Sequence, residues 1–209
     1  MMIQTAQAKD ISLGEIKKQF NLQLTTEPNF FNEWQSDLPV VSAAEQKQIA
    51  RIQQNYFNLA ERKSFSEESV KMVVLSPLLD LANFYQSPFG LMTEESIELS
   101  AEDEGLRVKG KIDVLVVKEK LWVLVVESKS TRFDVVSALP QALTYLLSAP
   151  NKEEPVYGLV VNGREFLFVK LQHGSRPIYA RSFALSIERE NELKQVLGIL
   201  KTFQRKMTT

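Results

Sequence analysis

The sequence predicts a mixed α/β (α+β) fold, in which a central sheet is flanked by helices. After residue 65, segments of helical and strand periodicity follow the order helix, three strands, helix, two or more strands, helix. The strand segments 112–117 and 121–127 are apolar on both faces, which is typical of central strands covered on both sides. The pair Asn162-Gly163 between two further apolar runs is a strong hairpin signal.

The first 62 residues are expected to form an N-terminal helical extension, ahead of a main domain over residues 63–209. The stretch "SAAEQKQIARIQQNYFNLAERK" opens with Ser42 and Glu45, which have the spacing of a capping box. One apolar stripe at helical spacing follows and comprises Ile49, Ile52, Tyr56 and Leu59. This extension would pack against the main domain.

The elements of the main domain follow in order. A helix is expected over residues 66–85, where Pro77 would kink it or separate two shorter helices. The expected strands and helices after it are strands 93–100, 107–117 and 121–128, a helix over 133–149, and paired strands 155–161 and 165–171. The stretch 188–206 predicts a closing amphipathic helix with one apolar face, which comprises Leu193, Val196, Leu197, Leu200 and Phe203.

The composition is that of an ordinary globular chain. Of 209 residues, 44% are hydrophobic and 24% are charged, as in most folded domains. No apolar run approaches the ~18–20 residues that a membrane-spanning helix needs. The N-terminus also lacks the basic and apolar segments of a secretory signal. We therefore expect a cytoplasmic protein without a membrane partner.

The near absence of cysteine and histidine narrows the chemistry. The sequence contains no cysteine and one histidine, His173. Disulfide frameworks, cysteine nucleophiles and Cys/His zinc sites are thereby excluded, and a Ser-His-Asp triad would need His173 as its base. His173 lies in "QHGSR", which indicates a loop with a solvated imidazole. Catalysis would therefore depend on carboxylates, lysines and a hard metal ion.

The net charge of −1 conceals two opposite halves. Residues 1–106 hold 8 basic and 16 acidic side chains, a net of −8, whereas residues 107–209 hold 17 and 10, a net of +7. A basic half is compatible with a phosphate-bearing partner, although helices also carry such charges on solvated faces. The acidic half would suit docking on a protein partner.

Three charged residues stand where two apolar strands come together. Asp113 interrupts the first strand of "GKIDVLVVKEKLWVLVVESKS", while Glu127 and Lys129 end the second and point to the same face. Charge on a buried strand is costly unless it is paired, hydrated or bound to a metal. If the strands form a hairpin that turns near residues 119–121, the numbers of opposed residues sum to about 239–240. Asp113 would then lie opposite Glu127 or one position diagonal to it.

This combination favours metal-assisted hydrolysis of a phosphodiester. Carboxylates are hard oxygen ligands suited to Mg²⁺ or Mn²⁺, and a bound metal lowers the pKa of its water and neutralises charge on the phosphate. Lys129 would hold the attacking water or offset charge in the transition state. The alternative is a cross-strand salt bridge between Lys129 and the carboxylates. Two acids against one base would leave an unmatched negative charge, which a cation would resolve.

An Asp on one strand and Glu-x-Lys at the end of the next resembles the PD-(D/E)XK restriction-endonuclease-like superfamily. The resemblance covers roughly residues 64–171 and is closest to the N-terminal nuclease domain of type I restriction R subunits. It rests on the stretches "SEESVKMVVLSPLL", "GKIDVLV" and "VVESK", and on "PQALTYL", which is similar to the Q-x-x-x-Y helix motif of RecB-like nucleases. It implies a restriction-endonuclease-like core of order αβββαβ, here with extra N-terminal and C-terminal helices.

Carried over residue by residue, the resemblance implies that Asp113 and Glu127 bind the metal ion and that Lys129 is catalytic. Glu67 would be an additional helix carboxylate near the metal, with a catalytic and metal-binding role. The chain departs from the pattern at Ile112, which stands where the family motif has proline.

The outer members of the motif have a second explanation. The resemblance implies that Gln141 contacts the site or the nucleic acid, and Tyr145 shares its helix face four residues later. However, Ser64 and Glu67 also have the spacing of a capping box, so Glu67 would simply start its helix. Glu68 is an equally available acid if the placement shifts by one residue. Gln141 and Tyr145 would also suit the polar edge of a packing helix.

The sequence therefore predicts a Mg²⁺- or Mn²⁺-dependent endonuclease that hydrolyses phosphodiester bonds. DNA is the expected partner, RNA remains open, and a homodimer would supply the two sites that cutting two strands requires. The alternative is a catalytically inactive module of the same fold that binds nucleic acid or a protein partner.

Overall fold

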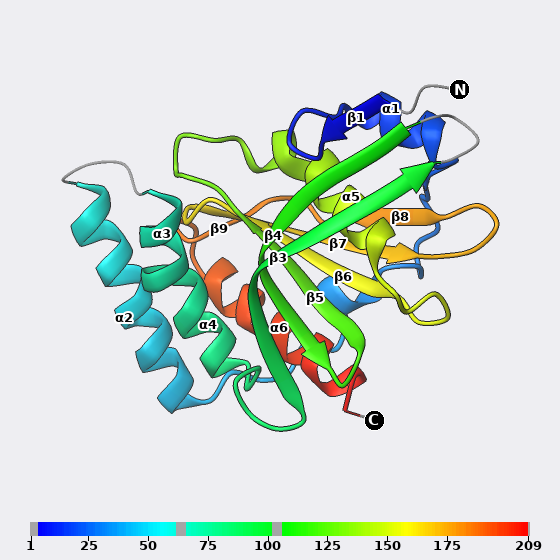
Figure 1. Ribbon diagram of the computed structural model, residues 1–209. Coiled ribbons are helices and arrows are strands. Elements are labelled where there is room, and N and C mark those ends of the chain that lie inside the picture. The colour runs from blue at the N-terminus through cyan, green and yellow to red at the C-terminus, as the bar shows by residue number, and fades with distance from the viewer. Residues whose placement is uncertain (1–3, 62–65, 102–105, 209) are drawn as a thin grey trace.

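The computed structural model describes residues 4–61, 66–101 and 106–208 (Figure 1). Within these residues, nine strands form one mixed sheet in the order β1-β4-β5-β6-β7-β8-β2, with β3 also paired to β4 and β9 to β7. The strands are β1 Gln4–Gln7, β2 Gln23–Leu24, β3 Phe89–Ala101, β4 Leu106–Lys118, β5 Leu121–Ser128, β6 Val156–Val161, β7 Glu165–Gln172, β8 Ile178–Arg181 and β9 Leu185–Ser186. The helices are α1 Leu13–Gln19, α2 Ala43–Ala60, α3 Glu67–Val70, α4 Ser76–Leu81, α5 Leu139–Ser148 and α6 Glu192–Lys206.

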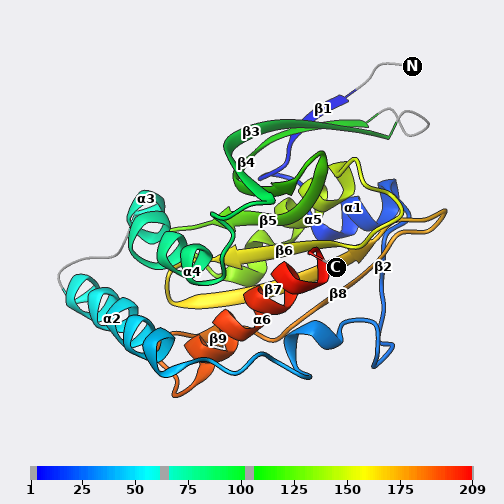
Figure 2. The same ribbon diagram turned by 90° about the horizontal axis from the view of Figure 1, so that it is seen from below.

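Helices cover both faces of the sheet, as expected from its apolar central strands (Figures 1 and 2). Buried side chains of α2, α3, α4 and α6 pack with one face of β4–β7 in a first hydrophobic core. Those of α1 and α5 pack with the other face in a second core. Because both faces are dry, a charged group on the central strands must find its partner locally.

Both predicted hairpins are confirmed. β4 and β5 turn at residues 119–120, and the numbers of their paired residues sum to 240 where Val114 lies opposite Val126, and to 239 nearer the turn. β6 and β7 turn at Asn162-Gly163, where Gly163 has a φ of 85°. The side-chain oxygen of Asn162 accepts two backbone N–H groups of the turn.

The helix expected over 66–85 is interrupted by a π-helical turn. This turn spans Lys71–Leu75 and joins α3 to α4. Pro77 lies in the first turn of α4, where its missing N–H leaves a carbonyl of the preceding turn without the usual donor. One extra residue is accommodated in that turn, and the Ser76 N–H donates to the carbonyl of Lys71. Pro77 therefore changes the helical register without separating the two helices.

The N-terminal segment differs from the predicted helical extension. Gln4–Gln7 form β1, which pairs parallel with β4, and Gln23–Leu24 form β2, which pairs parallel with β8. The helical prediction is wrong for these stretches because strands this short depend on the neighbouring strand rather than on their own periodicity. Helix α2 is confirmed, with the capping box at Ser42 and Glu45, although Leu59 of its expected apolar stripe is exposed.

The acidic and basic halves of the sequence do not form separate lobes. Glu45 of α2 accepts a hydrogen bond from Lys201 of α6 at 2.6 Å. Glu33 forms ion pairs with Lys170 at 2.7 Å and with Lys206 at 3.4 Å. Ion pairs between acidic residues of the first half and lysines of the second therefore hold the N-terminal segment against the C-terminal half.

The closing helix α6 is confirmed, and the five apolar residues predicted for its face are all buried. No helix in the described part of the chain combines the length and the apolar character that a bilayer crossing needs.

Strand β4 changes neighbours halfway along its length, and this gap positions the candidate site. β3 pairs with β4 throughout, whereas the other edge of β4 pairs with β1 over 106–109 and with β5 over 114–118. In the described residues no strand pairs with 110–113 on that edge. Figure 2 shows the β3–β4 ribbon and β1 rising away from the main sheet beyond this point. Backbone polar groups on this edge of 110–113 must therefore find partners other than a neighbouring strand.

Candidate active site

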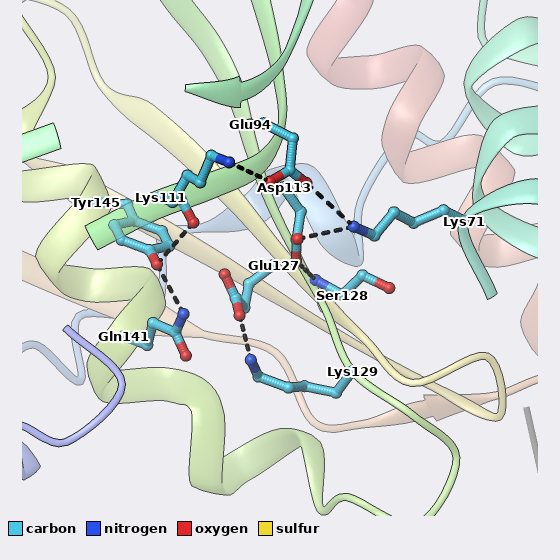
Figure 3. Close-up of polar contacts among 9 residues, drawn as sticks. All are labelled: Lys71, Glu94, Lys111, Asp113, Glu127, Ser128, Lys129, Gln141 and Tyr145. Carbon is cyan, nitrogen blue, oxygen red and sulfur yellow. Dashed lines mark hydrogen bonds and ion pairs between the residues drawn. The ribbon is translucent and has the colours of Figure 1, made fainter. Parts of the chain in front are cut away.

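Asp113 and Glu127 meet where β4 and β5 separate (Figure 3). The last pair of the ladder is Val114 with Val126, so the next two residues along, Asp113 and Glu127, lie opposite each other and point to the same face. In place of a further ladder bond, the Ser128 N–H donates to Oδ2 of Asp113 at 2.7 Å. The register predicted for the two strands is therefore found, and it places Asp113 directly opposite Glu127.

Asp113 uses both of its carboxylate oxygens. Oδ2 accepts the Ser128 N–H, and Oδ1 accepts a hydrogen bond from the Lys71 ammonium at 2.9 Å. The Asp113 side chain is 14% exposed and the Lys71 side chain 23%. Lys71 belongs to the π-helical turn before α4, and it reaches the carboxylate from that side (Figure 3).

Glu127 is the most deeply buried charged residue of the site, at 2% exposure. Its Oε1 forms an ion pair with the ammonium of Lys129, whereas its Oε2 is buried and has no hydrogen-bond partner. Burial, together with the nearby charge of Asp113, raises the pKa of the Glu127 carboxyl to about 8, although Lys129 acts in the opposite direction. A positive charge placed at Oε2 would remove the cost of ionising this group.

Lys71 and Glu94 are site residues that the sequence interpretation missed. Glu94 of β3 has a φ of 58° and lies 3.6 Å from the Lys71 ammonium and 2.8 Å from that of Lys111. In Lys71, the ion pairs with Asp113 and Glu94 outweigh burial and raise the pKa of the ammonium. The only sequence signal for Lys71 is its position as a lone charge in the apolar run "VKMVVL", four residues after Glu67.

Lys71 also corrects one premise of the metal prediction. Two acids against one base would have left an unmatched negative charge. The structure instead provides Lys71 for Asp113 and Lys129 for Glu127. The charge count alone therefore no longer requires a metal ion, and the unpartnered Oε2 of Glu127 becomes the observation that favours one.

Glu67 lies in the first turn of α3. In the described part of the chain no hydrogen bond or ion pair joins it to the site, and its charge acts on Lys71 and Glu127 at longer range. Ser66 is the N-cap of α3, and Ser64, the alternative cap, lies outside the described residues. Glu68 is exposed. Among residues 4–61, 66–101 and 106–208, no three His, Cys, Asp or Glu side chains gather closely enough to hold a metal ion.

Gln141 and Tyr145 fasten α5 to the unpaired edge of β4. The Gln141 amide donates to the Tyr145 hydroxyl at 2.7 Å, and that hydroxyl donates to the Lys111 carbonyl at 2.9 Å. The Tyr145 ring packs so closely on β4 that a Cβ added at Gly110 would lie 2.6 Å from it. Burial and the charge of Glu127 raise the pKa of the Tyr145 hydroxyl. These contacts give both residues a structural role beside the two carboxylates.

Two cavities adjoin the site. The first has a volume of about 640 Å³, and its polar lining includes Lys9, Lys109, Lys111, Gln141 and Tyr145. The second has a volume of about 500 Å³, and its lining includes Lys71, Asp113 and the more apolar Met72, Tyr85 and Leu91. The first cavity therefore carries lysines, of which Lys109 and Lys111 form ion pairs with Glu98 and Glu94, and the second offers mainly apolar surface.

His173 does not belong to this site, and its predicted solvation is wrong. The imidazole is half-buried beside another cavity, which Lys152 and Glu153 also line, and its Nε2 has no hydrogen-bond partner. Burial, with the nearby charge of Lys152, lowers the pKa of His173 to about 4. The imidazole is therefore neutral at physiological pH.

The donor set around Asp113 and Glu127 fits a hard divalent cation. Carboxylate oxygens are the ligands that Mg²⁺ and Mn²⁺ prefer, and Oε2 of Glu127 has no other partner. Asp113 would supply a second oxygen once Lys71 left Oδ1. With two carboxylates, the ion would complete its coordination with water or backbone carbonyls.

No protein-family model matches the chain, and no curated protein matches it. Among solved structures, the fold is similar to a fragment of a chain titled as an HsdR subunit of a type I restriction enzyme from Vibrio vulnificus YJ016, with a TM-score of 0.42 and 18% sequence identity. The match covers 65% of this chain and 26% of that one, so the chain spans about a quarter of the length of this structural neighbour.

Proposed function

We propose that this protein is a divalent-metal-dependent nuclease that hydrolyses phosphodiester bonds of nucleic acid. One observation carries the proposal. The carboxylates of Asp113 and Glu127 face the same side of the gap between β4 and β5, with an ammonium beside them and one buried carboxylate oxygen unpartnered. The order of helix, three strands, helix and strand around them supports the same conclusion, because it fits the restriction-endonuclease-like core that the motif resembles.

In this proposal the carboxylates of Asp113 and Glu127 would hold a Mg²⁺ or Mn²⁺ ion. Such an ion would supply an activated water and neutralise charge on the phosphate. Lys129, which already lies on Oε1 of Glu127, would orient the attacking water or stabilise charge on the phosphate oxygens. Glu67 remains a proposed outer acid, because its charge acts on Glu127 without a direct contact.

DNA is the proposed substrate, and the phosphates of RNA would contact the same side chains. Lys9, Lys109 and Lys111 line the cavity beside the site, where they would bind backbone phosphates. Gln141 is partly exposed in the same lining and would contact the nucleic-acid strand, whereas Tyr145, which is buried, would position Gln141. A homodimer would place two such sites for cutting both strands, and light scattering measures that state directly.

A second function is favoured by the charge balance. Because Lys71 pairs with Asp113 and Lys129 with Glu127, the formal charges of the site balance without a metal ion. In that case the chain would be an inactive module of the same fold that binds nucleic acid or a protein partner.

Cleavage of supercoiled plasmid, single-stranded DNA and RNA with Mg²⁺ or Mn²⁺ separates the two functions. The wild type is compared with Lys129→Ala and with Lys120→Ala, an exposed lysine in the β4–β5 turn, as the matched control. We expect metal-dependent cutting that falls by about 100-fold or more in Lys129→Ala and is unchanged in Lys120→Ala. No cutting and no binding of Mn²⁺ by the wild type would refute the nuclease proposal in favour of the inactive module.

A further inference from the structure

Lys71 makes a contact that conflicts with metal binding at the site. Its ammonium lies 2.9 Å from Oδ1 of Asp113, the oxygen that a cation between the two carboxylates would need. Both side chains are largely buried, so solvent screens this ion pair less than a surface pair. The neighbouring Oε2 of Glu127 is buried and without a partner. Lys71 thus neutralises one carboxylate and leaves the other incompletely satisfied.

The surroundings of Lys71 provide a second acceptor. Oε1 of Glu94 lies 3.6 Å from the same ammonium, and the Glu94 side chain is 51% exposed, so it has room to follow a moving partner. Its other oxygen forms an ion pair with Lys111 at 2.8 Å, which keeps the carboxylate at this edge of the sheet (Figure 3). A change in the side-chain rotamer of Lys71 would exchange Asp113 for Glu94 without moving the backbone.

We propose that Lys71 is a built-in counter-ion that exchanges with the divalent metal: it holds Asp113 when the metal is absent and moves to Glu94 when the metal binds. The inference rests on the proposed function, because it takes Asp113 and Glu127 as the metal-binding pair. Metal binding then costs one buried ion pair, so the site binds its metal more weakly than the two carboxylates alone would. The exchange also keeps the Lys71 ammonium near the metal, now paired with Glu94, where it would offset charge on the phosphate of a substrate.

Titration of the protein with Mn²⁺ tests the exchange without any need for cleavage. Binding is monitored by calorimetry and by the electron paramagnetic resonance signal of free Mn²⁺. The comparison uses wild type, Lys71→Met and Lys111→Met. Lys111→Met is the matched control, because it removes the same charge beside the same Glu94 but makes no contact with Asp113. We expect Lys71→Met to bind Mn²⁺ about 10- to 100-fold more tightly, as the loss of one charge-assisted hydrogen bond requires. Lys111→Met should change the affinity much less.

The outcomes distinguish failure of this inference from failure of the proposed function. If wild type and Lys71→Met bind Mn²⁺ with equal affinity, the exchange is refuted while the metal site stands. If the two lysine variants tighten binding equally, only general electrostatics is at work and the exchange is again refuted. If neither wild type nor Lys71→Met binds Mn²⁺, the proposed function fails together with the inference. Lys71→Gln, which can still donate to Asp113, replaces Lys71→Met if that variant does not fold.

The role of Glu94 is tested by a double-mutant cycle. Glu94→Gln removes the acceptor to which Lys71 moves, so it should weaken Mn²⁺ binding in the wild-type background. In the Lys71→Met background the same change should have a clearly smaller effect, because no ammonium needs a new partner. Equal effects in both backgrounds would mean that Glu94 acts on the metal only through its charge, and would remove it from the exchange.

Discussion

Ionisation of Glu127 should make the metal-free protein lose stability as pH rises, and Glu127→Gln should remove that loss. The folded-state pKa of Glu127 is raised to about 8 from an ordinary value of 4.5. Between those values the unfolded chain has released the proton while the folded chain retains it, so the free energy of unfolding falls by about 1.4 kcal/mol for each pH unit. The loss is absent below pH 4.5 and complete above pH 8, where it reaches about 5 kcal/mol.

Urea unfolding in EDTA between pH 5 and pH 8 measures this loss as the difference between the wild type and Glu127→Gln. The introduced amide has nearly the shape of the carboxylate and no charge to bury, so the variant should gain stability relative to the wild type as pH increases. Glu61→Gln is the matched control, because Glu61 is exposed at the end of α2, and its difference from wild type should not vary with pH. A difference between wild type and Glu127→Gln that stays constant over this range would refute the reasoning. It would mean that Glu127 is already ionised in the fold and fully compensated by Lys129.

Three further predictions follow from the same region. Binding of Mn²⁺ should release close to one proton at pH 7 and none well above pH 8, because a bound metal would ionise Glu127. Calorimetry in buffers of different ionisation enthalpy counts that proton. No proton release at pH 7 would contradict the raised pKa of Glu127. Gly110→Ala should destabilise the fold by about 1–3 kcal/mol, since its Cβ would lie 2.6 Å from the Tyr145 ring. Gly174→Ala is the control: the nearest atom to its Cβ would be 3.9 Å away, so its thermal unfolding should show a much smaller loss of stability. Tyr145→Phe should cost about 1–2 kcal/mol, because it leaves the Lys111 carbonyl without its 2.9 Å donor; unchanged stability would show that water replaces the hydroxyl.

Local periodicity was sufficient to predict most of the elements and the pairing of the central strands. The register of β4 and β5 follows from two apolar runs and a charged turn, because shifting one strand by a single residue would turn its apolar side chains to the wrong face. That register is also why Asp113 and Glu127 could be expected to meet. Helix α6 was predictable for a similar reason, since its five apolar residues can be buried on only one helical face.

The short strands β1 and β2 could not be predicted in this way. Each is stabilised by hydrogen bonds to a strand more than 90 residues away in the sequence, β1 to β4 and β2 to β8. Strands of four and two residues carry too little periodicity of their own to indicate a sheet. The gap in β4 between β1 and β5, which exposes the site, is likewise a property of the assembled sheet.

The sequence by itself determined which carboxylates converge, because strand alternation and the position of the turn already place Asp113 opposite Glu127 or one position diagonal to it. The tertiary structure alone decided which lysines pair with these carboxylates. Lys71 reaches Asp113 because the π-helical turn before Pro77 points it at β4, and Glu94 joins it from β3 at a positive φ. Such contacts between separate elements depend on packing rather than on local pattern. These contacts between elements determine which lysine a metal ion would have to displace from the carboxylates.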